Sequence, residues 1–180
     1  MAASALVEIT GTSALLMHAF PLTPIEALEK RSPQEQAEHA AYRDPDSGEL
    51  FMPGINLQRS FVASGAYSKG KGRGSLTMPV AACVMVSPER LLLGTKEFKI
   101  DSRAVVIAAT KGRIVRHRPR LDTWKVDFQI EWDETLLTEA QVRRVVDDAG
   151  TRVGVLDFRP AKKGPFGRFV VTSWQHGHRT

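Results

Sequence analysis

The sequence predicts an α+β domain from the order of its periodic segments. Residues 5–11 alternate apolar and polar side chains as a strand does, and a helical segment begins near Gly54. Two strand-like segments, a second helical segment and a final apolar strand, 169–174, follow. Strand, helix, two strands, helix and strand is the order of the ferredoxin-like fold. We therefore expect a ferredoxin-like core with insertions, spanning residues 1–180 as one domain.

Length and composition fit one compact domain. The chain has 180 residues, ordinary apolar content and no apolar run that approaches a membrane span. Residues 1–6 lack the features of a secretion signal, so we expect a cytoplasmic protein with no membrane partner. The single cysteine, Cys83, lies in an apolar run and is expected in the core rather than as a nucleophile. No zinc-type Cys/His spacing exists in the sequence, and we expect no metal and no cofactor.

Residues 21–50 form an acidic insertion between the first strand and the first main helix. Thr23-Pro24 and Ser32-Pro33 each place a capping hydroxyl before a proline suited to the first helical position, and a glutamate follows in each case. These signals predict two short helices. Residues 44–48, Asp-Pro-Asp-Ser-Gly, form a turn, after which 49–52 are expected to return as a short strand.

The first main helix is expected to follow Pro53-Gly54. Leu57 and Phe61 recur at helical spacing, Asn56 can cap the free amides, and Gly65 lies near the end. Residues 68–75 then form a glycine-rich loop with lysine and arginine.

Four apolar segments separate the two main helices. The type of 80–86 is left open, and 105–109 favour a strand. Segments 114–121 and 123–132 are expected to pair with each other, because the second of them alternates large apolar residues with polar ones.

The second main helix begins with a capping box that starts at Thr138. Gly150 is expected to end it, and residues 175–180 are expected to be a frayed tail. Its apolar stripe is Val142, Val145, Val146 and Ala149.

The charge pattern indicates a nucleic-acid ligand. The net charge is only +5, but 21–50 are acidic, so basic residues gather in loops elsewhere. Binding of a single strand requires cations along a phosphate track and flat groups for unstacked bases. Lys69, Lys71 and Arg73 lie among glycines, which let a backbone approach a phosphate.

A row of arginines adds to this pattern. Alternate residues of a strand share a face, so Arg116, Arg118 and Arg120 are expected side by side, with Arg113 nearby. No acidic residue lies between Lys111 and Leu121, and a polyanion would relieve the repulsion within the row. Pairing with the acidic insertion is the alternative, and the loops together favour nucleic acid.

Two segments resemble the signatures of the RAMP superfamily, the RNA-binding subunits of CRISPR effector complexes. FMPGINLQRSFVASGA, 51–66, matches the first signature at Met52, Pro53, Gly54 and Leu57. Asn56 stands at a serine position, and Gln58 and Arg59 stand where the family has Lys-Gly. VGVLDFRPAKKGPFGRFVVTSW, 153–174, matches the closing glycine-rich loop at 166–169.

The resemblance implies an RNA-recognition-motif (RAMP) core like that of the CRISPR-Cas backbone, Cas-seven-like, subunits. It also implies assembly side by side along a single strand, as a homo-oligomer or filament, with other effector-complex subunits as possible partners. RNA is slightly favoured over DNA. Backbone subunits that cut target RNA carry an aspartate after the first strand, and residues 12–25 contain no acidic residue, so cleavage is not carried over.

The resulting hypothesis is a non-enzymatic single-stranded nucleic-acid-binding protein. Phe166, on the glycine-rich loop, can either stack on a base or anchor the loop to the core. The contact between subunits is expected to join the loop 68–75 to the acidic insertion 21–50. The expected binding residues are Asn56, Gln58, Arg59, Lys69, Lys71, Arg73, Arg113, Arg116, Arg118, Arg120, Lys162, Lys163, Phe166 and Arg168.

Two other functions remain open. A metal-independent RAMP-type endoribonuclease would use His18, which follows the first strand, but its apolar surroundings predict a semi-buried histidine without a catalytic partner. A protein-only scaffold subunit would instead use the basic loops to meet acidic partner surfaces.

Overall fold

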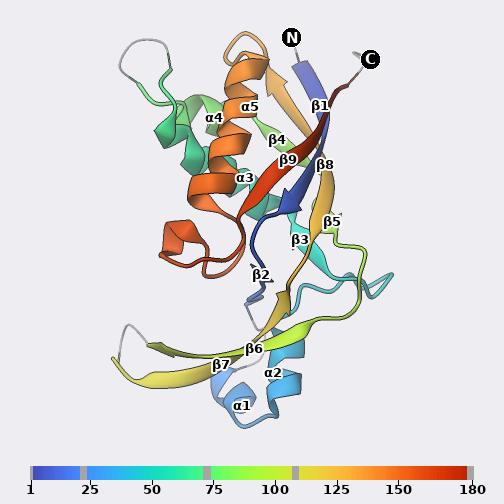
Figure 1. Ribbon diagram of the computed structural model, residues 1–180, viewed down its shortest axis with the longest axis vertical. Coiled ribbons are helices and arrows are strands. Elements are labelled where there is room, and N and C mark those ends of the chain that lie inside the picture. Colours follow the sequence, from blue (N-terminus) through green and yellow to red (C-terminus); the bar gives the residue numbers. More distant parts are fainter. Residues whose placement is uncertain (1, 21–23, 71–73, 107–109, 178–180) are drawn as a thin grey trace.

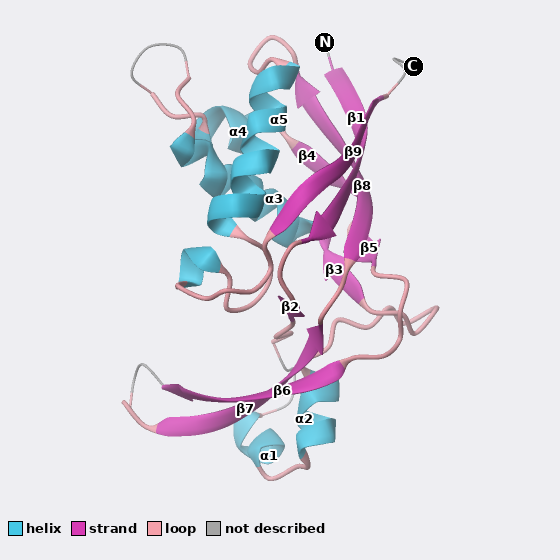
Figure 2. Ribbon diagram, viewed as in Figure 1, coloured by secondary structure: helices cyan, strands magenta, loops and turns pink. Residues whose placement is uncertain are grey.

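The computed structural model describes residues 2–20, 24–70, 74–106 and 110–177. Its main sheet has four antiparallel strands in the order β4-β8-β1-β9 (Figures 1 and 2). The first strand of the chain lies between the third and the fourth strands of this sheet, and the second is at the edge. This is the ferredoxin-like arrangement, so the predicted α+β fold class is confirmed. The strands are β1 (Ala2–Gly11), β4 (Met85–Ser87), β8 (Lys125–Asp133) and β9 (Phe169–His176).

Two helices cover one face of this sheet, α3 (Gly54–Ser64) and α5 (Glu139–Asp148) (Figure 1). Alternation sends every second side chain of β1 and β8 toward them, and Phe128 of β8 packs on Phe61 of α3. The predicted capping box is present at the start of α5, where Thr138 accepts a hydrogen bond from the Gln141 amide. The opposite face of the sheet carries no helix among the described residues.

A long two-stranded ribbon extends from the end of the molecule opposite the termini (Figure 1). It consists of β6 (Lys99–Val106) and β7 (Arg113–Leu121), and the short β2 (Leu15–Leu16) extends its sheet. The predicted pairing of 114–121 with 123–132 is therefore wrong. Val126, Phe128 and Ile130 of β8 fill the apolar core under the helices, whereas the arginines of β7 need water or carboxylate partners, so the two strands join different sheets.

The acidic insertion supports this ribbon. Its helix α2 (Pro33–His39) lies against β6 and β7, and α1 (Ile25–Glu29) packs on α2. Ser32 forms the predicted capping box. Thr23 lies outside the described residues, and Pro24 stands at the N-cap of α1. The chain then returns through β3 (Phe51–Pro53), which pairs with β5 (Arg90–Leu92).

Several segments differ in type or extent from the sequence-based expectation or were left open by it. Residues 80–86 divide between α4 (Thr77–Cys83) and β4, and residues 105–106 end β6, whereas 107–109 lie outside the described residues. Gly150 does not end its helical segment, because a π-turn, η2 (Ala149–Val153), continues α5. Residues 175–176 belong to β9 rather than to a frayed tail. Two short turns, η1 (Gly65–Tyr67) and η3 (Pro160–Lys162), complete the fold.

In the described part of the chain, none of the helices has the length and apolar character that crossing a membrane requires.

Gly150 brings η2 into close contact with β9, and this contact generates a stability prediction. A Cβ at Gly150 would overlap the carbonyl oxygen of Phe169, a backbone atom that cannot move aside easily. We expect Gly150→Ala to lower the free energy of unfolding by roughly 1–3 kcal/mol, measured by denaturant titration. Gly74→Ala is the matched control, because a Cβ at Gly74 meets no atom within 4 Å. Equal stability of the two variants would contradict this close packing.

Candidate nucleic-acid interface

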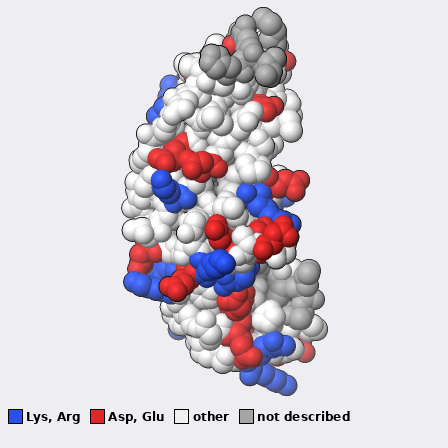
Figure 3. All heavy atoms as spheres, turned by 90° about the vertical axis from the view of Figure 1, so that its right-hand side faces the viewer, with Lys and Arg blue, Asp and Glu red and all other residues white. Residues whose placement is uncertain are grey.

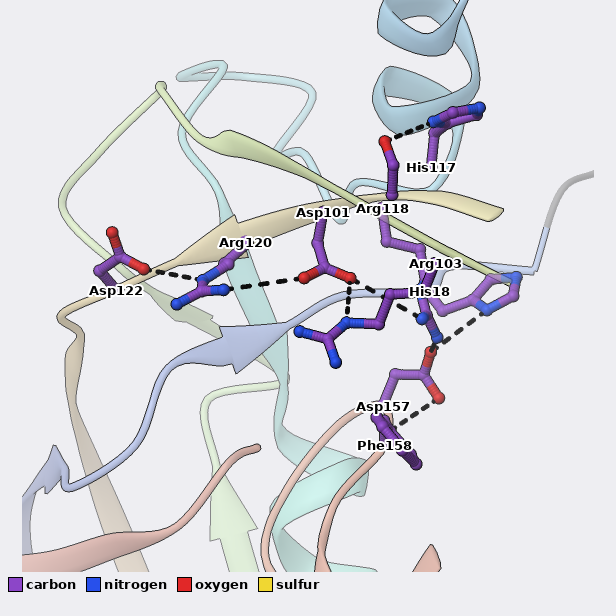
Figure 4. Close-up of polar contacts among 10 residues, drawn as sticks. His18, Asp101, Arg103, His117, Arg118, Arg120, Asp122, Asp157 and Phe158 are labelled. Atoms are coloured by element: carbon purple, nitrogen blue, oxygen red, sulfur yellow. Dashed lines mark hydrogen bonds and ion pairs between the residues drawn. The ribbon is translucent and has the colours of Figure 1, made fainter. Parts of the chain in front are cut away.

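Arg118 is buried, although the sequence predicted a solvent-facing arginine row. Its exposed fraction is 5%, and Nη1 lies 2.5 Å from Oδ2 of Asp157, while Nη2 lies 4.0 Å from Oδ1 of Asp101 (Figure 4). Asp101 stands directly across from Arg118 in the β6–β7 pairing. An ionised guanidinium away from water requires such partners. Arg118 is therefore a structural residue and not a free phosphate contact.

The rest of the row is partly neutralised in the same way. Arg120 lies 3.7 Å from Asp101 and donates to Asp122 at 2.8 Å, and Arg103 donates to Asp101 at 2.7 Å. The partners come from β6 and the loops rather than from the acidic insertion, which was the predicted alternative. Arg113 points to the opposite face of β7 from Arg116, because the two are an odd number of residues apart in a regular strand.

Asp157 connects this group of charges to the C-terminal loop. Burial alone raises the pKa of its carboxyl, but hydrogen bonds from His18 and Arg118, with the Arg118 charge, outweigh burial and hold the pKa at about 2. The Phe158 amide also donates to Asp157. Asp157 is thus ionised throughout the neutral range and ties β7, the loop and His18 together (Figure 4).

A pocket of about 320 Å³ lies beside Asp157, at the start of α3. His18 Nδ1 is 3.4 Å from Asp157 Oδ2, and its side chain is 37% exposed, so the predicted semi-buried, unpartnered histidine is corrected on both counts. Phe20 is 82% exposed and offers a flat group at the rim. The lining residues are His18, Phe20, Tyr42, Asn56, Leu156, Asp157 and Arg159.

Tyr42 and Asn56, both in the pocket lining, form a side-chain hydrogen bond. Burial raises the pKa of Tyr42, a hydrogen bond with Asn56 opposes this, and the Asp157 charge adds to the increase. Asn56 was predicted to cap α3, but it is the third residue of the helix, whose N-cap is Pro53 without a side-chain hydrogen bond. Asn56 therefore belongs to the pocket, as a candidate binding residue.

The glycine-rich loop borders the pocket through Leu156 and Arg159. Phe166 is 5% exposed, its ring centre is 6.0 Å from that of Phe158, and the Arg103 guanidinium lies 4.8 Å above it. Phe166 therefore anchors the loop, and the alternative of stacking on a base is excluded in this conformation. Lys162 and Lys163 remain exposed on and after η3.

The remaining predicted residues do not converge on this site. The Gln58 side chain accepts a hydrogen bond from the Val86 amide at 3.3 Å, and the Arg168 guanidinium donates to the Thr151 carbonyl, so both have structural roles. Arg59 is exposed on α3 but does not line the pocket. Lys69 follows η1 and pairs with Ser75 in an isolated bridge, outside the pocket lining, while Lys71 and Arg73 lie outside the described residues.

Sequence reasoning missed Phe20, Tyr42, Asp157 and Arg159 as site residues. Phe20 and Tyr42 lie at the two ends of the segment that carries α1 and α2, and no local pattern distinguishes them from core or surface aromatics. Their proximity to Arg159, more than a hundred residues later, exists only in the folded chain.

The main sheet does not supply stacking groups. Trp124, Phe128 and Trp132 are buried, as predicted, and Trp174 packs on Trp132 and donates to Glu139 of α5. The aromatic side chains of the described strands of this sheet thus point to its helix-covered side, so Phe20 is the exposed aromatic of the candidate site.

Comparisons with known proteins found a likeness to solved structures. No family model matches the sequence, and no curated protein matches it. A chain of a solved structure named "Type IV-B CRISPR Complex" is similar, with 14% identity and a TM-score of 0.49. The match covers 94% of this chain and 90% of that one. That name belongs to the solved complex, and what this chain binds depends on its own residues.

The depressed pKa of Asp157 gives a pH prediction. Because the folded-state pKa is about 2 and the ordinary value is 3.8, the stability from this carboxylate is present above pH 4 and is lost between about pH 4 and 2. It amounts to roughly 2 kcal/mol. Asp157→Asn should lower the unfolding free energy by at least that amount at neutral pH and reduce its decline below pH 4, measured by denaturant titration.

Asp147→Asn, on the surface of α5, is the control. Because it retains Asp157, it should lose stability between about pH 4 and 2 as the unmodified protein does. If the unfolding free energy of Asp157→Asn still declined below about pH 4 as steeply as that of the unmodified protein, the carboxylate would not be held by Arg118 and His18.

Proposed function

We propose that this chain is a non-enzymatic single-stranded nucleic-acid-binding protein of the RAMP type, with RNA favoured. One observation carries the proposal: a pocket with an exposed aromatic rim, Phe20, borders a loop that presents Arg159, Lys162 and Lys163. A flat group beside a row of cations is what an unstacked base and its phosphates need. The start of α3 adds the Asn56 amide, which can read a base edge or a phosphate.

The charges of the chain divide into structural and available ones. The arginines at the base of the ribbon form ion pairs with Asp101, Asp122 and Asp157. In contrast, no carboxylate of the described residues lies within 4.0 Å of the charged ends of Arg116, Lys162 or Lys163. Arg116 shares one face of β7 with Arg118, which contacts Asp157 at the pocket, so it lies on the pocket's side of the strand. These cations are suited to phosphates and carry no base preference.

The proposed strand is longer than one subunit covers. A single small domain offers a short track, and copies placed side by side on one strand would raise one another's effective concentration. We include this assembly, as a homo-oligomer or with other effector-complex subunits, in the proposal.

Salt dependence tests the binding mode. Each phosphate contact on a single strand contributes about 0.7 to the slope of log affinity against log salt. We expect Lys162→Ala with Lys163→Ala to weaken binding of a labelled single strand and to reduce the slope by about 1.4, measured by fluorescence anisotropy at several salt concentrations. Lys96→Ala with Arg144→Ala is the control, because it removes the same charge from exposed positions outside the site. A flat salt dependence of the unmodified protein, or no binding at low salt, would overturn the proposal.

A second function is favoured by the contact of His18 with Asp157. A carboxylate 3.4 Å from Nδ1 can orient an imidazole whose other nitrogen accepts a proton from a ribose 2'-hydroxyl. The 2'-oxygen would then attack the adjacent phosphorus to form a 2',3'-cyclic phosphate, and the bond to the 5'-oxygen would break as that oxygen takes a proton from water, without a metal. Asp157 also serves the buried Arg118, however, so its presence is accounted for by structure alone.

We expect no cleavage of structured RNA in the presence of a chelator, and we expect His18→Ala to change stability rather than turnover, because Asp157 loses one hydrogen bond. Denaturing gels and thermal melts measure the two outcomes. His176→Ala is the control, since His176 pairs with Glu139 away from the pocket. A discrete cut that disappears in His18→Ala and persists in His176→Ala would make the endoribonuclease the better function.

A further inference from the structure

The helix-free face of the main sheet is a second surface that the proposed function does not use. Its side chains come from alternate positions of β1 and β8 and from β4, and we call it the open sheet face. Leu6 and Met85 are exposed there by 55% and 65%. A groove of about 610 Å³ crosses it, lined in part by Leu6, Ser87 and Gln129. Figure 3 looks onto this side, and its upper half, which contains the sheet, shows few basic side chains.

The open sheet face carries more carboxylates than cations, which disfavours a polyanion. Glu8 and Asp127 stand directly opposite each other on β1 and β8, and Glu131 stands opposite Met85. A hydrogen bond from Thr172 and the contact with Lys125 lower the pKa of Glu8, so it is ionised at neutral pH. Like charges directly opposite on paired strands destabilise a sheet. The surface therefore favours an occupant that is both apolar and cationic.

The same chain presents such an occupant on the ribbon. Ala104 pairs with Val115 and Val106 pairs with Arg113, so these four residues share one face of the β6–β7 ribbon. Val106 and Val115 are 59% and 53% exposed, and Ala104 and Arg113 are exposed as well. We call this the distal ribbon face. The sequence from Ser102 to His117 contains no aspartate or glutamate, so the charged side chains beyond Asp101 on the ribbon are all cationic.

We propose that the distal ribbon face of one copy docks on the open sheet face of a second copy. Apolar Val106 and Val115 would cover Leu6 and Met85, and Arg113 would meet the carboxylate of Asp127. Two β-surfaces can pack flat against each other at about 10 Å. The contact would bury apolar area that is exposed in the single chain. It would also bring Arg113 to Asp127, which otherwise faces the carboxylate of Glu8.

The positions of the two surfaces determine the kind of assembly. The ribbon and the main sheet lie in opposite halves of the molecule (Figure 1), so one chain cannot satisfy both surfaces by itself. The two surfaces differ, so each copy that joins covers one surface and leaves its own second surface uncovered for the next copy. Such a contact gives a ring or an open filament. Arg116, on the other face of the ribbon, stays available to nucleic acid. This contact deepens the side-by-side assembly of the proposed function and rests on it.

The proposed contact differs from the one expected from the sequence, between the loop 68–75 and the acidic insertion. In the acidic insertion, Glu38 pairs with Arg43 at 2.5 Å and Asp44 with Arg90 at 2.9 Å, so those carboxylates already have partners within the chain. Asp127 and Glu131 have no cation within 4.0 Å among the described residues.

Charge exchange tests the contact. Sedimentation velocity over a concentration series, with and without a long single strand, should show concentration-dependent association of the unmodified protein. Asp127→Arg and Arg113→Glu should each weaken it by roughly tenfold or more, because like charges then meet. Mixing the two variants should restore association. Asp127→Arg places an arginine opposite Glu8, so the variant is expected to fold. Asp147→Arg and Arg144→Glu, both on α5, are the controls and should associate normally.

The outcomes separate this contact from nucleic-acid binding. A protein that stays monomeric at every concentration and on a long strand overturns the contact, as do single variants that associate normally or a mixture that fails to associate. Binding of a strand too short for two subunits is measured in parallel with Asp127→Arg. If no strand binds, but the protein still associates, each single variant weakens association and the mixture restores it, then the proposed function fails and the contact stands.

Discussion

The burial of Arg118 is the constraint on which the rest of the arrangement depends. A guanidinium remains ionised at any relevant pH, and removing it from water without a partner costs several kcal/mol. Asp157 and Asp101 supply the compensation from two segments that are otherwise separate, the C-terminal loop and β6. The ion pairs thereby fix where the ribbon stands relative to the ferredoxin-like core. The Nε of Arg118 has no hydrogen-bond partner, so this burial is only partly satisfied.

The candidate pocket is a consequence of the same contacts. Asp157 can reach Arg118 only if the loop folds back onto β2, where its amide donates to the Leu16 carbonyl at 3.0 Å. That path places Arg159 beside Asn56 and holds His18 at the rim. Phe166 locks the loop from below, under the Arg103 guanidinium, which is itself held by Asp101. One buried ion therefore organises side chains from four distant parts of the sequence.

The fold also sorts the charges into surfaces of different character. Alternation along β7 sends Arg116 and Arg113 to opposite faces, and alternation along β1 and β8 sends carboxylates to the side of the sheet that lacks helices. A net charge of +5 conceals this separation. A basic track for phosphates and an acidic, partly apolar face for protein can thus coexist on one small domain.

Local patterns in the sequence determined the elements that depend on neighbours in the chain. The capping boxes at Ser32 and Thr138, the alternation in β8 and the helix after Gly54 were all predictable, and their order gave the fold class. Tertiary structure alone decided which strands pair, because the arginines of β7 exclude it from the apolar core whatever its β propensity. It alone decided that Arg118 is structural and Arg116 available, since burial depends on Asp101 and Asp157, which no spacing links to them. Binding sites assembled from distant segments follow from packing and charge compensation, which a single sequence does not display.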